Sequence, residues 1–227
     1  MIIAALSVLS QYDPARRLLF THIPKNAGTS IRQWLEQWVP DSQAMPNLHK
    51  HHTPQHLHTR HLEDYTHFAV VRNPYDRLLS HYNFHVERYA AYLRPKSRLA
   101  RKQEYHDKYA ELRQGFANWL TAPHPMADRD AKWYDYRWCT QSTWINDRTH
   151  VLRYENLAED FQWVQERVGV WEPLDTLNPT TADTDHTTPA NRVLLADHRT
   201  LIQSHLMVDF RRFGYAPDFN RAGKLGG

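Results

Sequence analysis

The sequence predicts an α/β fold with a parallel central sheet, and two observations carry this prediction. Short apolar runs have the length of buried strands, and each precedes a segment in which apolar residues recur every three or four positions. The two kinds of segment alternate along the chain, and strands that alternate with helices form parallel sheets. Because no repeat and no change of composition marks a boundary, we expect a single domain over residues 1–227.

The first strand is expected at residues 18–23, where an apolar run ends at Pro24. The helix behind it carries one apolar stripe, formed by Ile31, Trp34, Leu35 and Trp38. A second strand is predicted at residues 67–71. Asn73 and Pro74 follow it and are typical of the N-cap and first residue of a helix.

The second half of the chain continues the alternation. One helix is expected through Tyr109, Leu112, Phe116 and Leu120. A third strand is predicted at residues 151–154, followed by a helix over about 157–168 that ends at Gly169. A last helix is expected over about residues 189–210.

Composition excludes several classes of protein. A net charge of +3 over 227 residues is too small for a dedicated nucleic-acid binder. The single cysteine, Cys139, cannot form an internal disulfide. Residues 1–10 are apolar but lack the basic start of a signal peptide, and no run reaches the ~18 apolar residues of a membrane span. We therefore expect a cytoplasmic protein in which residues 1–10 are buried.

The loop at residues 24–30, Pro-Lys-Asn-Ala-Gly-Thr-Ser, is a candidate anion site. It lies where a helix begins, and free backbone N–H groups and the helix dipole attract anions there. Gly28 would let the backbone approach a ligand, Thr29 and Ser30 carry hydroxyl donors, and Lys25 adds a cation. The order of Lys and Gly differs from a Walker A loop. The alternative is a plain turn with a surface lysine.

A second candidate anion site follows the second strand. Arg72 comes at the carboxyl edge of the sheet, where open α/β folds bind ligands. Ser80 lies off the stripe formed by Leu78, Leu79 and Tyr82, which leaves it able to face a ligand. An arginine and a hydroxyl can hold one phosphate, although a salt-bridged arginine and a solvated serine would fit the pattern as well. Two anion sites at one edge indicate a ligand with two separated anionic groups.

Both stretches resemble motifs of the carbohydrate sulfotransferases that use 3′-phosphoadenosine 5′-phosphosulfate (PAPS). Residues 22–30 are similar to the loop that holds the 5′-phosphosulfate, and residues 71–82 to the motif that holds the 3′-phosphate. Residues 153–157, Arg-Tyr-Glu-Asn-Leu, and residues 209–215 are weaker matches. The resemblance runs over about residues 18–216 and is closest to bacterial members and to the heparan and chondroitin O-sulfotransferases.

This resemblance implies a P-loop-NTPase-like three-layer sandwich with a central parallel sheet and extra helices. It implies an O-sulfotransferase that moves a sulfuryl group from PAPS to an acceptor hydroxyl, of a glycan or another small alcohol, and leaves adenosine 3′,5′-bisphosphate. No metal is required, and a bacterial, cytoplasmic version of the family is expected. The pattern gives no indication of the oligomeric state.

The resemblance also implies roles for individual residues. Lys25 would contact the bridging oxygen of the phosphosulfate, and Arg72 and Ser80 would hold the 3′-phosphate. The 5′-phosphate would be held by the backbone and hydroxyls of Asn26, Ala27, Gly28, Thr29 and Ser30. Asn26 stands where the family commonly has Thr.

The general base is expected in a histidine-rich stretch, because histidine accepts protons near neutral pH. Six histidines lie between residues 49 and 61. The family often has Lys-His-x-Thr there, and residues 50–53 match this pattern, which selects His51. His52 is the alternative after a slip of one residue, and Glu63 is the nearest glutamate that could serve instead.

Two other functions fit parts of the pattern. The histidine-rich stretch could bind a metal or an anion in a protein that is no enzyme. A P-loop-like phosphotransferase would need a Walker A lysine and a Mg²⁺-binding aspartate, and neither is evident. The basic and aromatic segment from Tyr82 to Tyr136 could form a groove for an acidic glycan or a solvated helical face.

Overall fold

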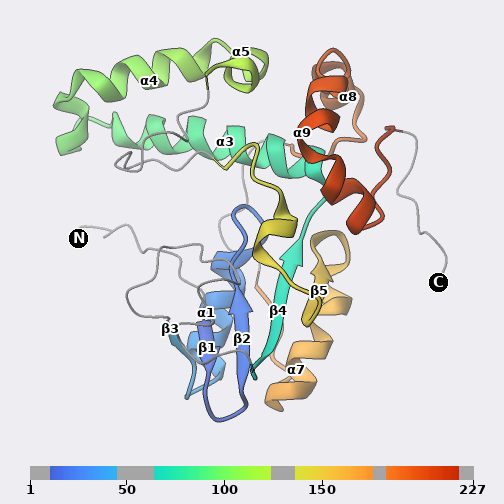
Figure 1. The fold of residues 1–227 in the computed structure, drawn as a ribbon. Helices are drawn as coiled ribbons and strands as arrows, with labels where there is room; N and C mark the ends of the chain where they lie inside the picture. Colours follow the sequence, from blue (N-terminus) through green and yellow to red (C-terminus); the bar gives the residue numbers. More distant parts are fainter. Residues whose placement is uncertain (1–10, 45–63, 124–135, 176–182, 220–227) are drawn as a thin grey trace. The chain divides into compact units, whose positions relative to one another are not determined.

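A computed structural model describes residues 11–44, 64–123, 136–175 and 183–219 (Figure 1). The chain divides into two compact units. The first consists of Met1–Asn73 and Thr140–Pro179, and the second of Pro74–Cys139 and Thr180–Gly227. Each unit is therefore assembled from two separate stretches of sequence.

The first unit is built on a sheet whose described strands follow the order β3-β1-β2-β4-β5. Its centre consists of β2 (Leu18–Thr21), β4 (Thr66–Val71) and β5 (Thr149–Arg153), which run parallel. Val71 lies beside Arg153 in the register, so β4 and β5 end together. The three predicted strands and their parallel arrangement are confirmed, with small shifts of their ends.

Two short strands that the sequence did not predict complete the sheet. β1 (Gln11–Asp13) and β3 (Gln43–Ala44) pair antiparallel at the β2 edge, so the sheet is mixed rather than parallel throughout. β1 is polar, yet Gln11 and Asp13 are buried because Gln11 donates to Glu36 and Asp13 accepts from Arg16. A polar strand of three residues has no apolar alternation by which to recognise it.

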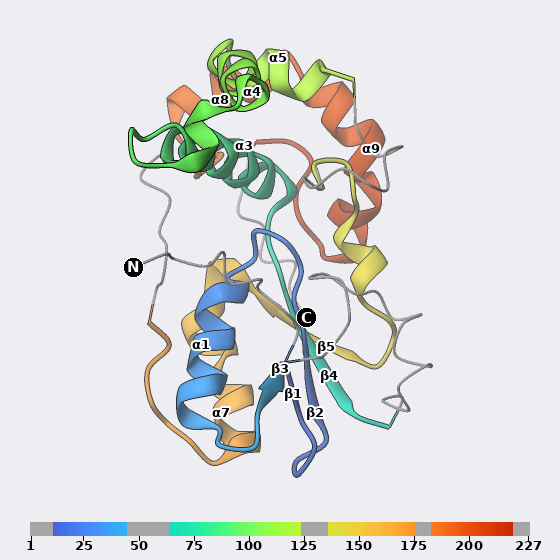
Figure 2. The ribbon, with the colours of Figure 1, turned by 90° about the vertical axis from the view of Figure 1, so that its left-hand side faces the viewer.

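Helices cover one face of this sheet. Figure 2 shows α1 (Gly28–Trp38) and α7 (Gln162–Val168) on the same side of the strands. Buried residues of both helices and of β2, β4 and β5 form one apolar cluster, in which the rings of Trp34 and Phe161 meet edge to face at 4.9 Å. The mixed α/β class is thus confirmed, whereas the three-layer sandwich stays a prediction.

The predicted helix ending at Gly169 is present with one interruption. α6 (Leu157–Asp160) and α7 flank Phe161, which keeps a right-handed helical backbone. Gly169 has a φ of 72° at the end of α7, the left-handed conformation that glycine adopts most readily. The predicted helix end is therefore confirmed at this residue.

The second unit is helical in its described part. Its helices are α3 (Pro74–Tyr92), α4 (Gln103–Arg113), α5 (Phe116–Thr121), α8 (Pro189–Ala196) and α9 (Arg199–Arg212). Their buried faces share one apolar cluster centred on α3. α3 begins at Pro74, as predicted. No helix in the described residues is long and apolar enough to cross a membrane.

Two predicted helices are each divided in the structure. The helix expected through Tyr109 and Leu120 breaks at Gly115, whose φ of 111° belongs to no helix. The last helix breaks between Ala196 and Arg199, where α9 turns away from α8. In both cases the apolar spacing continues through the break, so periodicity alone predicted one helix where the structure has two.

Candidate anion site

The segments that follow the three parallel strands meet at the carboxyl edge of the sheet. The loop of residues 22–27 follows β2, Arg72 and Asn73 follow β4, and the short helix η4 (Tyr154–Asn156) follows β5. Parallel strands bring their carboxyl ends to one edge, where α/β folds bind ligands. The first unit therefore brings the loop and Arg72 to one edge, as the sequence predicted. It also places there the start of residues 153–157, the third motif, for which no position was predicted.

The backbone of the loop adopts an unusual conformation. Lys25 has a φ of 71° and Ala27 a φ of 58°, although neither is glycine. Such residues are uncommon, and they occur mainly where function requires a particular backbone. Left-handed residues between right-handed ones also turn successive N–H groups toward one side, which makes a concavity suited to anions.

The start of α1 has no acidic residue of its own. Ala27 is the N-cap and provides no side-chain hydrogen bond, and the first turn of α1 carries no acidic residue. A helix start attracts anions, because its first N–H groups have no partner within the helix and the dipole is positive there. Thr29 and Ser30, in the same turn, are placed where the sequence predicted hydroxyl donors.

Gly28 is required for a reason that the sequence did not reveal. A Cβ atom added to it would lie 1.7 Å from Cδ2 of His22, whose buried ring packs against the glycine. The backbone of Gly28 itself is helical. The ring of His22 is enough to explain why residue 28 has no side chain. The glycine is therefore no evidence that a ligand approaches it, and that approach stays a prediction.

Asn26 directs its side chain into the protein. The residue is 1% exposed, and its Nδ2 donates to the carbonyl oxygen of Val70 and to Oε1 of Gln141, both at 2.7 Å. Both amide hydrogens are thereby used. Any contact of Asn26 with the predicted anion would consequently come from its backbone N–H.

Gln141 is a residue of the site that sequence reasoning missed. It is fully buried at the start of the short helix η3 (Gln141–Trp144). Its Oε1 accepts from the backbone N–H of Arg72 at 2.9 Å, and its Nε2 donates to the carbonyl of Arg72 at 2.8 Å. No local pattern predicts this, because its partners Arg72 and Asn26 lie 69 and 115 positions away.

Arg72 lies over an aromatic ring. Its side chain is 6% exposed, and its guanidinium carbon is 4.0 Å from the centre of the Tyr154 ring, a cation–π contact. Next to it, the N–H of Asn73 donates to Oε1 of Glu155 at 2.6 Å. The third motif, which was a weak match in sequence, thus contacts the second motif directly.

The remaining predicted site residues belong to the second unit or lie outside the described residues. Ser80 is on α3 in the second unit and is 4% exposed, so the alternative of a solvated serine is wrong. Its partnership with Arg72 stays a prediction. His51, His52 and Glu63 lie outside the described residues.

One group of three side chains in the described part of the chain could hold a metal ion: Asp76, Asp185 and His186. His186 contacts Oδ1 of Asp76 through both Nδ1, at 2.8 Å, and its backbone N–H, at 2.7 Å. Hydrogen bonds from Thr187 lower the pKa of Asp185. These contacts attach residues 183–188 to α3 within the second unit, which accounts for the clustering of the three side chains.

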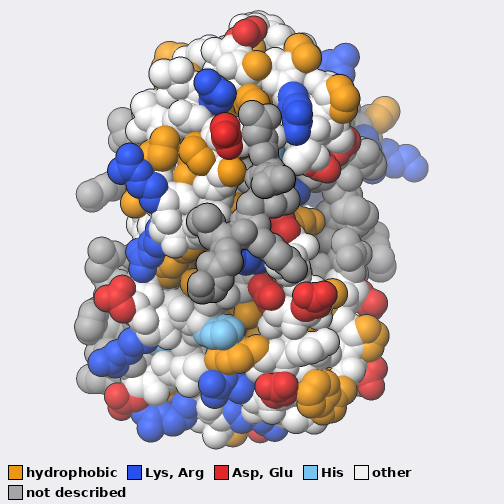
Figure 3. All heavy atoms as spheres, turned by 90° about the vertical axis from the view of Figure 1, so that its right-hand side faces the viewer, with side chains coloured by type: hydrophobic (Ala, Val, Ile, Leu, Met, Phe, Trp, Pro, Cys, Tyr) orange, Lys and Arg blue, Asp and Glu red, His pale blue; other side chains and the backbone are white. Residues whose placement is uncertain are grey.

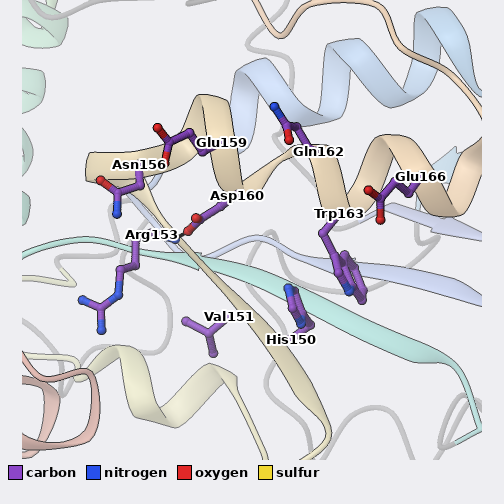
Figure 4. A pocket seen from close by; sticks show the side chains of 9 residues that line it. All are labelled: His150, Val151, Arg153, Asn156, Glu159, Asp160, Gln162, Trp163 and Glu166. Carbon is purple, nitrogen blue, oxygen red and sulfur yellow. Dashed lines mark hydrogen bonds between the residues drawn. The ribbon is translucent and has the colours of Figure 1, made fainter. Parts of the chain in front are cut away.

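A separate shallow concavity of about 570 Å³ lies along β5 (Figure 4). His150 and Trp163 stack within it, with their ring centres 3.8 Å apart, and burial followed by the charge of Arg167 lowers the pKa of His150. Glu159, Asp160 and Glu166 also line it, so it does not favour an anion. Its lining residues in the described chain include neither Arg72 nor any residue of the loop.

Figure 3 draws the side chains of one face, coloured by type. Acidic and basic side chains are interspersed there among the coloured residues, without a broad field of one sign. This agrees with the small net charge of +3.

Comparison with known proteins adds the following. A model of the sulfotransferase family matches residues 11–216. Carbohydrate sulfotransferase 11 of Mus musculus and that of Rattus norvegicus are each 24% identical to the chain over 237 residues. The matches cover 90% of this chain and 66%, slightly under two thirds, of each relative. No solved structure is significantly similar.

Proposed function

Because the chain belongs to the sulfotransferase family, we propose that it transfers a sulfuryl group from PAPS to a hydroxyl group of a carbohydrate. The observation that carries the proposal is the convergence of the loop and Arg72 at one edge of the sheet. Both are tied to Gln141, and each suits one of the two anionic ends of PAPS. The carbohydrate acceptor is proposed from the names of the two relatives.

The described residues fit a nucleotide with two anionic ends. The left-handed residues Lys25 and Ala27 suit the 5′-phosphosulfate, as does the start of α1, whose first turn carries no acidic residue. Arg72, supported by Tyr154, suits the 3′-phosphate, and Ser80 would complete that end. When bound, PAPS supplies a sulfuryl group attached to a phosphate that is a stable leaving group.

The chemistry that these residues would assist is an in-line displacement. The acceptor oxygen bonds to sulfur while the bond from sulfur to the bridging oxygen breaks. Lys25 offsets the negative charge that grows on the bridging oxygen. His51 takes the proton of the acceptor hydroxyl, with His52 or Glu63 as alternatives. The protein needs no metal for these roles.

A cluster of exposed basic residues in the second unit is the proposed acceptor surface. It lies between α3 and α4 and consists of Arg94, Lys96, Arg98, Arg101 and Lys102. The neighbouring aromatic residues Tyr89 and Tyr105 are buried in the helical core, so they do not form a stacking surface for sugars. A cluster of exposed basic residues favours an acidic carbohydrate over a neutral one.

The test is calorimetric titration with adenosine 3′,5′-bisphosphate, the product that shares both phosphates with PAPS. We expect binding that Lys25→Ala and Arg72→Ala each remove. Arg32→Ala is the matched control, since Arg32 is equally buried but bonds to Glu36 on α1. Absence of binding together with tight zinc uptake would replace this proposal with a metal-binding function for the histidine-rich stretch.

The activity itself is tested by transfer of ³⁵S from labelled PAPS. Acidic glycans, neutral oligosaccharides, lipids and small alcohols are offered in parallel. Label on a glycan is the expected result. Label found only on lipids or small alcohols would contradict the carbohydrate acceptor and leave the donor assignment in place.

A further inference from the structure

Gln141 joins two segments that the proposed function assigns to opposite ends of the donor. We infer that Gln141 is a positioning residue, which fixes the anion loop and Arg72 relative to each other so that both phosphates are bound together. The inference rests on the proposed function for its ligand, but the contacts that support it belong to the protein alone.

The side-chain amide of Gln141 is in a defined orientation. Its Oε1 accepts from Nδ2 of Asn26 at 2.7 Å and from the N–H of Arg72 at 2.9 Å, while its Nε2 donates to the carbonyl of Arg72. A flipped amide would place its NH₂ group against two donors. Since Gln141 is fully buried, no water competes for these bonds, and a low dielectric strengthens them.

The contacts with Arg72 continue the sheet by one residue. β4 ends at Val71, so the backbone of Arg72 has left the regular ladder. Gln141 supplies the acceptor and the donor that a neighbouring strand would supply. This fixes the Cα atom of Arg72, from which its guanidinium extends over Tyr154.

The contact with Asn26 fixes the loop in the same way. Asn26 lies between Lys25 and Ala27, the two residues with positive φ, and is also bonded to the carbonyl of Val70 on β4. A backbone in this uncommon conformation persists only where surrounding contacts hold it. One amide therefore holds the chain beside both Lys25 and Arg72, the two cations assigned to the donor.

The direct test compares Gln141→Met with Gln165→Met. Methionine keeps the length and volume of glutamine but removes its polar atoms. Gln165 is the matched control, because it is another buried glutamine of the first unit and donates to the carbonyl of Glu172 at 2.8 Å. Calorimetry measures the Kd of adenosine 3′,5′-bisphosphate and of adenosine 5′-phosphate for each protein.

We expect Gln141→Met to weaken binding of the bisphosphate by about tenfold or more, because it removes three buried hydrogen bonds. The monophosphate lacks the group that Arg72 holds, so its affinity should fall less. The ratio of the two Kd values therefore changes in Gln141→Met and stays constant in Gln165→Met. Equal weakening of both ligands, or unchanged affinity in a destabilised protein, would show a merely structural role.

A milder variant guards against a protein that fails to fold. Gln141→Glu keeps an oxygen to accept from Asn26 and Arg72 and loses the bond to the carbonyl of Arg72. Its bisphosphate affinity should fall, while Asn26→Ala, which removes the bonds of the loop to Gln141 and to Val70 but keeps those of Arg72, should weaken both nucleotides. Affinities equal to the parent in both variants would overturn the inference.

Amide hydrogen exchange without ligand separates this inference from the proposed function. Gln141→Met should speed exchange in peptides covering residues 22–30 and 70–75, and Gln165→Met should not. If the parent protein binds no bisphosphate, the proposed function fails, yet the exchange result still decides whether Gln141 fixes both segments. Unchanged exchange in both peptides would overturn the inference even in a protein that binds the nucleotide.

Discussion

Arg72 holds its guanidinium carbon 4.0 Å from the centre of the Tyr154 ring, across the carboxyl ends of β4 and β5. The two residues belong to different motifs of the sequence. Their contact is a cation–π interaction that restrains a long, flexible side chain at the position where the sequence predicted a phosphate ligand. Tyr154, to which no ligand role was assigned, thus supports the arginine that is predicted to bind the phosphate.

Tyr154→Leu should weaken binding of adenosine 3′,5′-bisphosphate about 2- to 30-fold, since a cation–π contact contributes roughly 0.5–2 kcal/mol. Tyr154→Phe keeps an aromatic face and should bind nearly as well as the parent. The control is Trp163→Leu, which removes the comparable contact of Arg167 with Trp163 at 4.2 Å. Titration calorimetry measures all three; equal affinities in the Leu and Phe variants would contradict a role for the ring.

Gly28→Ala should destabilise the protein by about 2–4 kcal/mol, because its methyl group would overlap the ring of His22. Thermal unfolding measures the change. Adding His22→Ala should recover part of the loss. In the control Gly169→Ala, where a Cβ meets nothing within 4 Å, only the φ of 72° resists the change, so His22→Ala should give no recovery.

The stability of the protein should rise with pH as His150 loses its proton. Burial and the charge of Arg167 hold the pKa of His150 in the folded protein below 6.5, its ordinary value in the unfolded chain. At a pH between the folded and the unfolded pKa, the unfolded chain therefore binds more protons than the folded one. The contribution is complete above about pH 6.5 and is lost as the pH falls toward the folded pKa. Denaturant unfolding measured across this range tests the slope.

The matched variant for this pH dependence is His150→Phe, which keeps a ring against Trp163 but cannot bind a proton. The stability of this variant should no longer change with pH in the range where His150 changes the stability of the parent. A profile identical to that of the parent would assign the pH dependence to other groups.

Reversing the charge of the basic cluster should impair use of an acidic acceptor. We expect Arg94→Glu combined with Arg98→Glu to raise the KM for unsulfated chondroitin, with little change for a neutral oligosaccharide or in the Kd of adenosine 3′,5′-bisphosphate. Both residues are exposed, so their effect should shrink at high salt. Arg211→Glu, at an exposed position of α9, is the control. An equal rise of KM for both acceptors would contradict charge recognition.

His51→Ala should abolish sulfuryl transfer and leave the affinity for adenosine 3′,5′-bisphosphate nearly intact, because a general base acts on the acceptor and not on the nucleotide. Transfer of ³⁵S and calorimetry measure the two properties separately. If His51→Ala remains active while His52→Ala does not, the base is His52.

The parts of the fold that sequence could predict are those fixed by local physics. Buried apolar runs identified the three parallel strands, and Pro74 and Gly169 marked a helix start and a helix end. The position of Arg72 at the carboxyl edge followed from its place directly after a predicted strand of a parallel sheet. These features depend on neighbours in sequence or on a general rule of parallel sheets.

The features that sequence could not predict depend on distant partners. β1 is buried only because Glu36 and Arg16 satisfy its polar side chains. The need for Gly28 comes from the ring of His22, and the role of Gln141 from three hydrogen bonds across the first unit. The single domain expected from sequence stays a prediction, since the structure divides the chain into two units.

The order of residues in the chain also sets when the anion site can form. During synthesis the loop and Arg72 leave the ribosome well before Gln141, which follows Arg72 by 69 positions. At a usual rate of about 5–20 residues per second, this delay lasts several seconds. Throughout that interval the nascent chain holds both cationic segments without the amide that joins them, so the site becomes complete only after Gln141 has been added.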